Sequence, residues 1–527
     1  MTLSLSTMAA MRYGYGLKPG EEYAPGGAAD LIKQVEKGAG IKPRFPREGF
    51  EGRRETVLRL LSVRAVEAKA AQAGNPNPEL RKETLREADR ILRRDSSARI
   101  MQAVLSPLGF YERLASFWTD HFSVNARKTY ATRMIVSLYE AEAIRPRVGG
   151  AFVDLLHAAI LHPAMLIYLD QNRSVGPGSP AAQRNGRGLN ENLGRELLEL
   201  HTMGAGSGYT QEDVRGAALI LTGVSVDART LEVSYRRARA EPGELSLLGK
   251  TYGEEGRSQN DHVTMLDDLA ARPETARHVC QKLVRYFIAD EPPAEVVEAM
   301  VAVWTQNGGN LTAVYKAMLE QPRAWAGEGQ KFKQPFDFVV SGLRALDVKG
   351  DELAAMSKAL DDEDAEVPRR PDEQLDEEDD AAQAAPSARA PVVGADMGKP
   401  KPAGAAAEIP GDLKKATAKA TGPKPGFARA VTFGALRRMG QPVWQPPSPA
   451  GFADDANAWL SPSQLSERIA WARLAVRGLG KDLDPQGFLQ VALADAARPD
   501  TIKVVGQAPN KVHGLTMVLA SPEFNRR

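Results

Sequence analysis

The sequence has little of several features that mark particular classes of protein. Among its 527 residues there is one cysteine, Cys280, so neither an intramolecular disulfide nor a zinc site built from several cysteines is possible. Cys280 lies in an apolar, helix-like run, which favours an inert packed thiol over a nucleophile. No apolar run approaches the ~20 residues that span a bilayer, so no transmembrane segment is predicted. Residues 1–12 lack the basic start and long apolar run of a signal peptide, and we therefore expect a cytoplasmic protein.

The chain also lacks an excess of charge of either sign. Lys and Arg total 68 and Asp and Glu total 67, so the formal net charge is +1. Nothing in this balance indicates binding to nucleic acid or to an anionic membrane. Hydrophobic residues make up 43% and charged residues 26%, which is typical of a globular protein with a sizeable core.

What the sequence does have is helical periodicity along most of its length. Val57, Leu60 and Leu61, for example, recur at the spacing of one helix face. Strand patterns are confined to residues 230–236 and 245–248, which could pair as a small hairpin. We predict a mainly α fold, a multi-helix globular bundle with at most a small β-hairpin.

One segment, residues 349–428, breaks this pattern. It contains acidic runs at 361–366 and 376–380, followed by a stretch of Ala, Pro, Lys and Gly with few large apolar residues. Such a segment buries too little surface to offset chain entropy, so we predict a disordered insertion. It divides a helical domain into a main part, 1–348, and a C-terminal part, 429–527. A solvated spacer is the favoured interpretation, and the alternative is an acidic segment that binds a basic protein partner.

Two helices are predicted around a glycine turn between residues 190 and 222. Asn190 is suited to cap the first helix, 190–203, and Gly204 to end it. Thr210 and Asp213 have the spacing of a capping box, so a second helix should begin there.

The first of these helices carries potential metal ligands. Glu191, Glu196, Glu199 and His201 are carboxylates and an imidazole, which are suitable ligand types. On a helix of 100° per residue, however, His201 lies roughly 140° from Glu196 and roughly 160° from Glu199, so one ion cannot contact all three. Two hypotheses remain open, a metal site that uses Glu196 and a buried polar network. Arg195 follows Glu191 by four residues and could form an ordinary helix salt bridge with it.

Other polar residues could complete a site near this helix. His121 follows Trp118 by three residues, so aromatic side chains should surround it, and a hydrogen-bonded core histidine is favoured over a ligand or base. Neighbouring Asp120 should point elsewhere. Further candidates that could contribute to a polar site are Asp170, Asn172 and Asn190.

The glycine-rich loop 173–189 leads into the start of the predicted 190–203 helix. It carries Arg184 and Arg187, and a helix N-terminus favours anions. No phosphate-binding fingerprint is present, so a plain mobile loop is favoured over an anion site.

Several segments along the chain carry motifs that follow one another in a recognisable order. They are MAAMRYGYGLKPGE at 8–21, FWTDHFSV at 117–124, HPAMLIYLDQN at 162–172, NENLGRELLELHTMG at 190–204, YTQEDV at 209–214, KFKQPFDFVV at 331–340, MGQPVWQPP at 439–447 and SPEF at 521–524. In this order they resemble the bacterial domain of unknown function 1800 family. Thr119 and Phe452 depart from the family's pattern. Asn or His is more usual at the position of Thr119, and Trp at that of Phe452.

The resemblance implies a helical protein, often of the bacterial envelope, without an established activity. The first hypothesis is therefore a binding or assembly factor linked to the cell envelope, which would place it in the periplasm or at the envelope. The alternative is a metal- or anion-dependent enzyme with its site around the 190–203 helix. The residues identify no cofactor and no catalytic signature.

Overall fold

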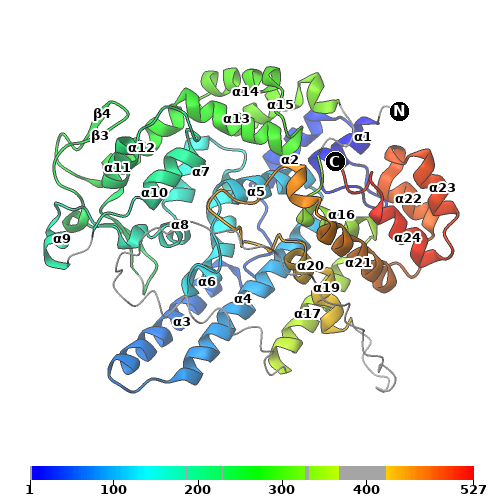
Figure 1. Cartoon of the computed structure of the whole chain (residues 1–527), viewed down its shortest axis with the longest axis horizontal. Coiled ribbons are helices and arrows are strands. Elements are labelled where there is room, and N and C mark those ends of the chain that lie inside the picture. The colour runs from blue at the N-terminus through cyan, green and yellow to red at the C-terminus, as the bar shows by residue number, and fades with distance from the viewer. Residues whose placement is uncertain (1–2, 186–187, 228, 327–330, 367–422) are drawn as a thin grey trace, which may run out of the picture.

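The computed structural model describes residues 3–185, 188–227, 229–326, 331–366 and 423–527, and helices dominate it (Figure 1). The helices before residue 225 are α1 Leu5–Met8, α2 Ala28–Gly38, α3 Gly49–Gln72, α4 Pro78–Leu105, α5 Gly109–His121, α6 Tyr130–Leu138, α7 Phe152–Ile160, α8 Pro163–Tyr168, α9 Pro180–Asn185, α10 Asn192–Glu196 and α11 Gln211–Leu221. Those after it are α12 Gln259–Ala271, α13 Pro273–Phe287, α14 Ala294–Gln306, α15 Leu311–Leu319, α16 Pro335–Ala345, α17 Gly350–Glu366, α19 Pro425–Val431, α20 Phe433–Arg438, α21 Pro462–Leu479, α22 Pro485–Leu493, α23 Pro499–Gly506 and α24 Lys511–Ala520. The predicted mainly α fold is confirmed.

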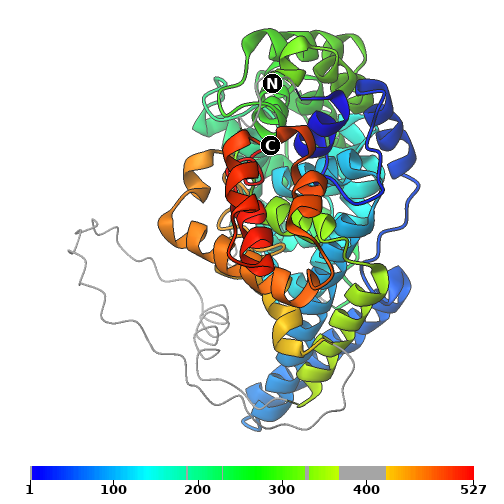
Figure 2. The same cartoon turned by 90° about the vertical axis from the view of Figure 1, so that its right-hand side faces the viewer.

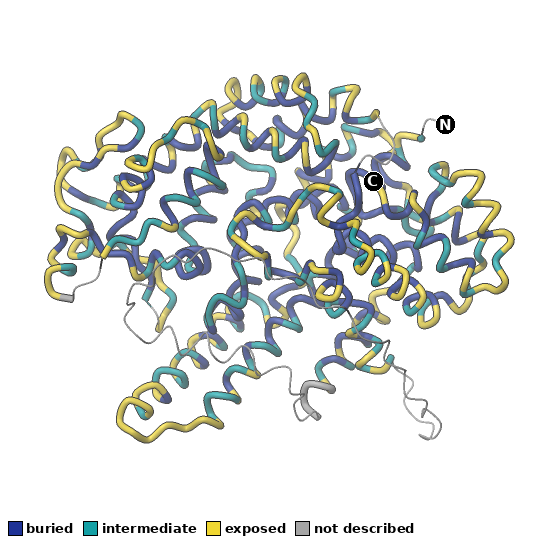
Figure 3. Tube along the Cα trace, viewed as in Figure 1, coloured by how far each residue is buried: buried dark blue, intermediate teal, exposed yellow. Residues whose placement is uncertain are grey.

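The helices form one body from which a long arm projects. Helices α3 and α4 make this arm, and its tip is exposed, whereas the centre of the body is buried (Figures 1 and 3). Helices α13, α14 and α15 lie along one side, and α22, α23 and α24 form a compact group at one end (Figures 1 and 2). The C-terminal group contacts the N-terminal segment, where Ser4 N donates to Asp495 Oδ2 at 2.6 Å.

A single core joins residues on both sides of the 349–428 segment. Tyr13 and Trp118 belong to the same buried cluster as Trp471 and Phe524. Gly342 of α16 allows Trp471 of α21 to approach, because a Cβ on Gly342 would lie 2.4 Å from that indole ring. Two parts of the chain that are distant in sequence are thus packed closely enough to enclose a site between them.

The predicted N-terminal boundary of the disordered insertion, residue 349, is wrong. Residues Gly350–Glu366 form helix α17, on which Leu353, Met356 and Leu360 are buried. These three side chains share one helix face, and α17 packs on α4 and α19. The predicted insertion was also too long at its other end, because α19 begins at Pro425. Residues 367–422 lie outside the described residues.

The two predicted strand runs form strands, but they do not pair with each other. Val233–Tyr235 (β2) pairs with Val224–Val226 (β1), and Leu245–Leu247 (β3) pairs with Lys250–Tyr252 (β4), both antiparallel. Each run therefore finds its partner in the nearest stretch of chain. Among the described helices, none combines the length and the apolar character needed to cross a membrane.

Candidate functional site

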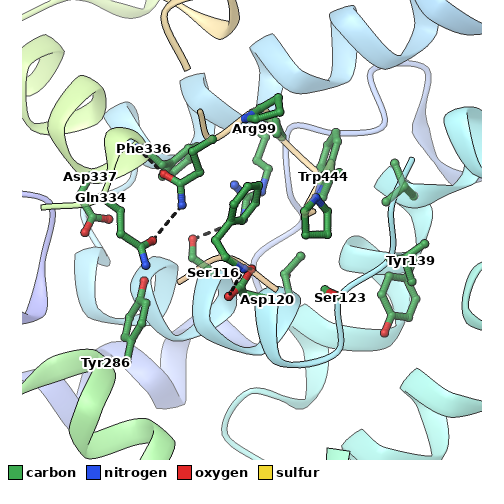
Figure 4. Close-up of a pocket in the computed structure, with 18 residues that line it drawn as sticks. Arg99, Ser116, Asp120, Ser123, Tyr139, Tyr286, Gln334, Phe336, Asp337 and Trp444 are labelled. Carbon is green, nitrogen blue, oxygen red and sulfur yellow. Dashed lines mark hydrogen bonds between the residues drawn. The ribbon is translucent and has the colours of Figure 1, made fainter. Parts of the chain in front are cut away.

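A cavity of about 60 Å³ lies where α4, α5 and α16 meet residues 441–452 (Figure 4). Its apolar walls include Tyr139, Tyr286, Phe336, Pro442, Trp444, Pro446 and Phe452. Its polar groups include Arg99, Ser116, Thr119, Asp120, Ser123, Gln334, Asp337 and Gln441. Because one water needs roughly 10–15 Å³, the cavity has room for a few heavy atoms.

Arg99 of α4 extends to this cavity between two aromatic rings. Its guanidinium carbon lies 4.7 Å from the Phe336 ring centroid and 5.7 Å from that of Trp444. Nε donates to Oε2 of buried Glu140 at 2.6 Å, and the same oxygen accepts from Trp444 Nε1 at 2.6 Å. Nη2 reaches Ser116 Oγ at only 3.4 Å. Within the described part of the chain, Nη1 makes no hydrogen bond.

Asp120 stands in the last turn of α5, next to the end of the 441–452 segment. The backbone N–H of Phe452 donates to its carboxylate, at 3.0 Å to Oδ1 and 3.2 Å to Oδ2. Gly451 makes this approach possible, because its φ is +86° and a Cβ there would lie 2.6 Å from Asp120 Oδ2. The contact therefore depends on a residue without a side chain.

Burial, followed by the nearby carboxylate of Asp454, raises the pKa of Asp120 to about 7. The Phe452 N–H, Lys282 and Arg99 act in the opposite direction. Lys282 lies on α13 and interacts electrostatically with both carboxyl groups, while burial lowers its own pKa. A carboxyl group with a pKa of about 7 is partly protonated at neutral pH.

Two glutamine amides fix the loop that closes the cavity. Gln441 Nε2 donates to Gln334 Oε1 at 2.9 Å, and Gln441 Oε1 accepts from Phe336 N at 2.7 Å (Figure 4). Gln334 Nε2 in turn donates to Ala453 O at 3.2 Å and to Asp454 Oδ1 at 3.3 Å. These bonds hold both amides in place and tie residues 441 and 453–454 to the start of α16.

Tyr286 of α13 forms another wall of the cavity, next to Asp337, which lines the cavity and belongs to a buried ion pair. Asp337 is paired with Arg113 at 2.9 Å and with Arg527, all three being buried. The guanidinium carbons of Arg113 and Arg527 lie 4.9 Å and 5.0 Å from the Tyr286 ring centroid. The Tyr286 hydroxyl makes no hydrogen bond within the described residues.

His121 and His201, predicted as site residues, meet in the core and not at the cavity. His121 Nε2 lies 3.2 Å from His201 O, and His201 Nδ1 lies 3.1 Å from His121 O. Burial lowers the pKa of His201 to about 3 and that of His121 well below its usual value. This reciprocal pair joins the end of α5 to residues Leu197–His201, and it fits the favoured interpretation of a hydrogen-bonded core histidine.

The predicted 190–203 helix is shorter and changes its geometry midway. Asn190 is not its N-cap: α10 begins at Asn192, whose N–H donates to Asn190 Oδ1 at 2.9 Å. After Glu196 the chain continues as a π-helix, Leu197–His201. Its i→i+5 bonding invalidates a wheel of 100° per residue. The Thr210 and Asp213 capping box is confirmed.

The acidic residues of this helix lie at its partly exposed side, away from His201. Glu196 and Glu199 are half-buried, and burial, followed by the charge of Glu199, raises the pKa of Glu196. Glu191 and Arg195 form the predicted i,i+4 pair at 3.7 Å. No group of three or more His, Cys, Asp or Glu in the described part of the chain is arranged to hold a metal ion.

The remaining candidate residues are dispersed. Asp170 pairs with Lys128 at 3.0 Å, and Asn172 contributes its backbone oxygen to Arg239 at 2.7 Å. Asn190 N donates to Ser174 Oγ at 3.1 Å. In the loop predicted to bind anions, Arg184 Nε donates to Pro180 O at 3.1 Å, whereas Arg187 lies outside the described residues.

Asp120 is adjacent to His121 in the sequence but faces another direction, so it was not among the predicted site residues. That direction is the cavity, and the group that completes the site there is a backbone N–H 332 residues later. A carboxylate in the last turn of a helix is unfavourable for the helix dipole, and this was the local signal that could have marked it.

Fold and cavity define a mainly helical protein in which α4, α5, α13 and the 441–452 segment enclose a small cavity with apolar walls and several polar groups. A family model described as a protein of unknown function (DUF1800) matches residues 9–526, so the chain belongs to this family, as its motifs indicated. No curated protein and no solved structure matches the chain.

Three of the segments that carry the family resemblance converge on the cavity. Residues 117–124 supply Asp120, 331–340 supply Gln334 and 439–447 supply Trp444. Thr119 and Phe452 also line the cavity.

Proposed function

We propose that the protein binds a small molecule, or a small end of a larger one, in the cavity beside Asp120. One observation carries this proposal: side chains from separate helices face one cavity with hydrogen-bonding capacity that the protein leaves unused. Asp120 accepts only from the Phe452 N–H, and the Tyr286 hydroxyl and Arg99 Nη1 have no partner in the described residues. A few such groups among apolar walls are typical of a ligand site.

The other polar groups of the cavity serve the fold. Ser123 Oγ donates to Pro449 O at 2.9 Å, and Thr119 Oγ1 donates to Ala115 O at 2.7 Å. The two glutamine amides are bonded to each other and to backbone. Arg99 Nη1 and the Tyr286 hydroxyl, by contrast, have no hydrogen-bond partner in the described residues, which supports a binding role for them.

Linkage to the cell envelope is the second element of the proposal, and family resemblance supports it. The acidic segment would add a contact to a basic partner. Asp361, the first residue of the acidic run 361–366, already pairs with Arg47 at 2.7 Å and with Arg94 at 2.9 Å. The second acidic run, 376–380, lies outside the described residues. Fractionation of the source cells tests this element, since recovery of the native protein only in the cytosolic fraction would contradict it.

A matched pair of variants tests binding in the cavity. Thr119→Phe places a ring in the cavity, whereas Thr251→Phe places the same ring on the exposed strand β4. Acetate, acetamide and methylammonium are small enough to enter, and ligand-observed NMR detects their weak binding. We expect the wild type and Thr251→Phe to bind at least one probe and Thr119→Phe to bind none. No binding to the wild type, or equal binding to Thr119→Phe, would refute the proposal.

An enzyme is the second candidate, and the pKa of Asp120 favours placing its chemistry at this cavity. A carboxyl group with a pKa of about 7 is suited to act as a general acid or base at neutral pH. Incubation of a metabolite extract with the protein, followed by mass spectrometry, tests this candidate. Conversion that Asp120→Asn abolishes would support it, and an unchanged extract would count against it.

A further inference from the structure

We propose that the group received by the cavity is a carboxylate, held by the Arg99 guanidinium and the Tyr286 hydroxyl. This inference rests on the proposed binding function and names its chemical class of ligand. It depends on which groups still have donors to offer, on the charge of the surrounding core, and on the position of Asp120.

The donors that remain free are those that suit a carboxylate. Arg99 uses Nε for Glu140 but retains Nη1, and its contact from Nη2 to Ser116 Oγ is long at 3.4 Å. The Tyr286 hydroxyl supplies a further donor. A carboxylate accepts at both oxygens and matches the planar fork of a guanidinium.

Aromatic contacts hold the Arg99 guanidinium in place for this task. Phe336 and Trp444 lie against it, with ring centroids at 4.7 Å and 5.7 Å, and its side chain is 11% exposed. The fork is therefore fixed before a ligand arrives, which reduces the entropy lost on binding.

The buried cluster that reaches the cavity at Asp337 contains more cationic than anionic side chains. Arg113, Arg468 and Arg527 are buried around Asp337. Lys333 interacts electrostatically with all four, but burial lowers its pKa to about 7, so it is charged at pH 6 and largely neutral at pH 8. Buried nitrogens of all three arginines have no hydrogen-bond partner among the described residues. The field from these groups favours an anion in the adjacent cavity and disfavours a cation.

Asp120 opposes a carboxylate only when it is ionised. Its charged surroundings are Asp454, two residues after Phe452, Lys282 from α13 and Arg99 from α4. With a pKa of about 7, Asp120 is neutral at pH 6 and can donate a hydrogen bond to a bound carboxylate. At pH 8 it is ionised and repels the ligand. If only the protonated form binds, the affinity falls about tenfold from pH 6 to pH 8.

Three probes of nearly equal size and different charge test the inference. The full chain is titrated with acetate, acetamide and methylammonium at pH 6 and pH 8, with detection by ligand-observed NMR. We expect acetate to bind most tightly at pH 6 and about tenfold more weakly at pH 8. Tighter binding of acetamide or methylammonium, or acetate binding that does not weaken with pH, would overturn the inference.

Two conservative variants assign the interaction to its groups. Tyr286→Phe removes a hydroxyl without a partner in the described residues and keeps the ring against Arg113, so the fold should persist while acetate binds about tenfold more weakly. Asp120→Asn keeps a neutral donor at every pH and should retain acetate binding at pH 8. Asp170→Asn, at a carboxylate paired with Lys128 outside the cavity, is the matched control and should keep the wild-type pH dependence. Unchanged acetate binding in Tyr286→Phe, or wild-type pH dependence in Asp120→Asn, would contradict the assignment.

The probes also separate this inference from the proposed function. If acetamide or methylammonium binds in the cavity and acetate does not, the binding function stands and the carboxylate is wrong. If none of the three binds, both fail.

Discussion

The backbone N–H of Phe452 donates to the carboxylate of Asp120 at 3.0 Å, across 332 residues of chain. This bond fastens the 441–452 segment to the last turn of α5 and so closes one side of the cavity. It also leaves most of the acceptor capacity of Asp120 directed at the cavity. The Asp120 side chain should therefore affect both the stability of the fold and the proposed binding of a ligand.

Asp120→Asn is expected to stabilise the fold at pH 8. The pKa of Asp120 is raised to about 7 from an ordinary value of 3.8, so this group's contribution to stability is full below pH 3.8 and is lost as the pH rises to about 7. Replacing the ionised group should raise the free energy of unfolding by about 1–2 kcal/mol at pH 8, a figure reduced for partial exposure. Urea unfolding at pH 8 checks this value, and a less stable variant would show that the carboxylate is preferred in its charged form.

Histidine burial predicts acid sensitivity. Burial lowers the pKa of His201 to about 3, so the stability that this neutral group contributes is present above its unfolded pKa of about 6.5 and is lost as the pH falls toward 3. From pH 7 to pH 5, the wild type should lose about 2 kcal/mol more than His201→Gln. The exposed His513→Gln is the matched control. Equal losses in the wild type and His201→Gln would contradict the neutral buried state.

The Asp337 ion pair should be essential for the junction between the chain's two parts. Asp337→Asn leaves the buried guanidinium groups of Arg113 and Arg527 without their counter-ion, which should cost about 3–5 kcal/mol. Glu467→Gln breaks an exposed pair with Arg438 and should cost less than about 1 kcal/mol. Chemical denaturation measures the free energy of unfolding of the two variants. Similar losses of stability in both would mean that groups other than Asp337 neutralise the buried guanidinium charges.

A metal bound through the helix near residue 196 should be absent. Glu196 and Glu199 lie at a half-buried side, whereas His201 is in the core, so they offer no shared coordination sphere. Elemental analysis of the purified wild type and of Glu196→Ala should give the same metal content. A stoichiometric metal that is lost in the variant would restore the metal-site hypothesis.

Features that depend on residues close together in the sequence could be predicted. The capping box of Thr210 and Asp213 and the salt bridge of Glu191 with Arg195 depend on spacings of three and four residues, and both are present. Helix α17 was missed because acidic residues outweighed the spacing of Leu353, Met356 and Leu360, whose burial stabilises it.

The candidate site could not be predicted in the same way, because its groups meet only through tertiary packing. Arg99 and Trp444 come together at Glu140 across more than 300 residues, and no periodicity in one sequence indicates that meeting. The π-helix at Leu197–His201 was likewise not predicted, and regular helical geometry does not apply to His201 within it.

The most direct test is the titration of the Asp120 carboxyl carbon by ¹³C NMR, with Asp120→Asn identifying its signal and acetate added in a second titration. A pKa of about 7 in the free protein, shifted upward by acetate, is the expected result. An ordinary pKa near 4 that acetate leaves unchanged would contradict a ligand site at this carboxyl group.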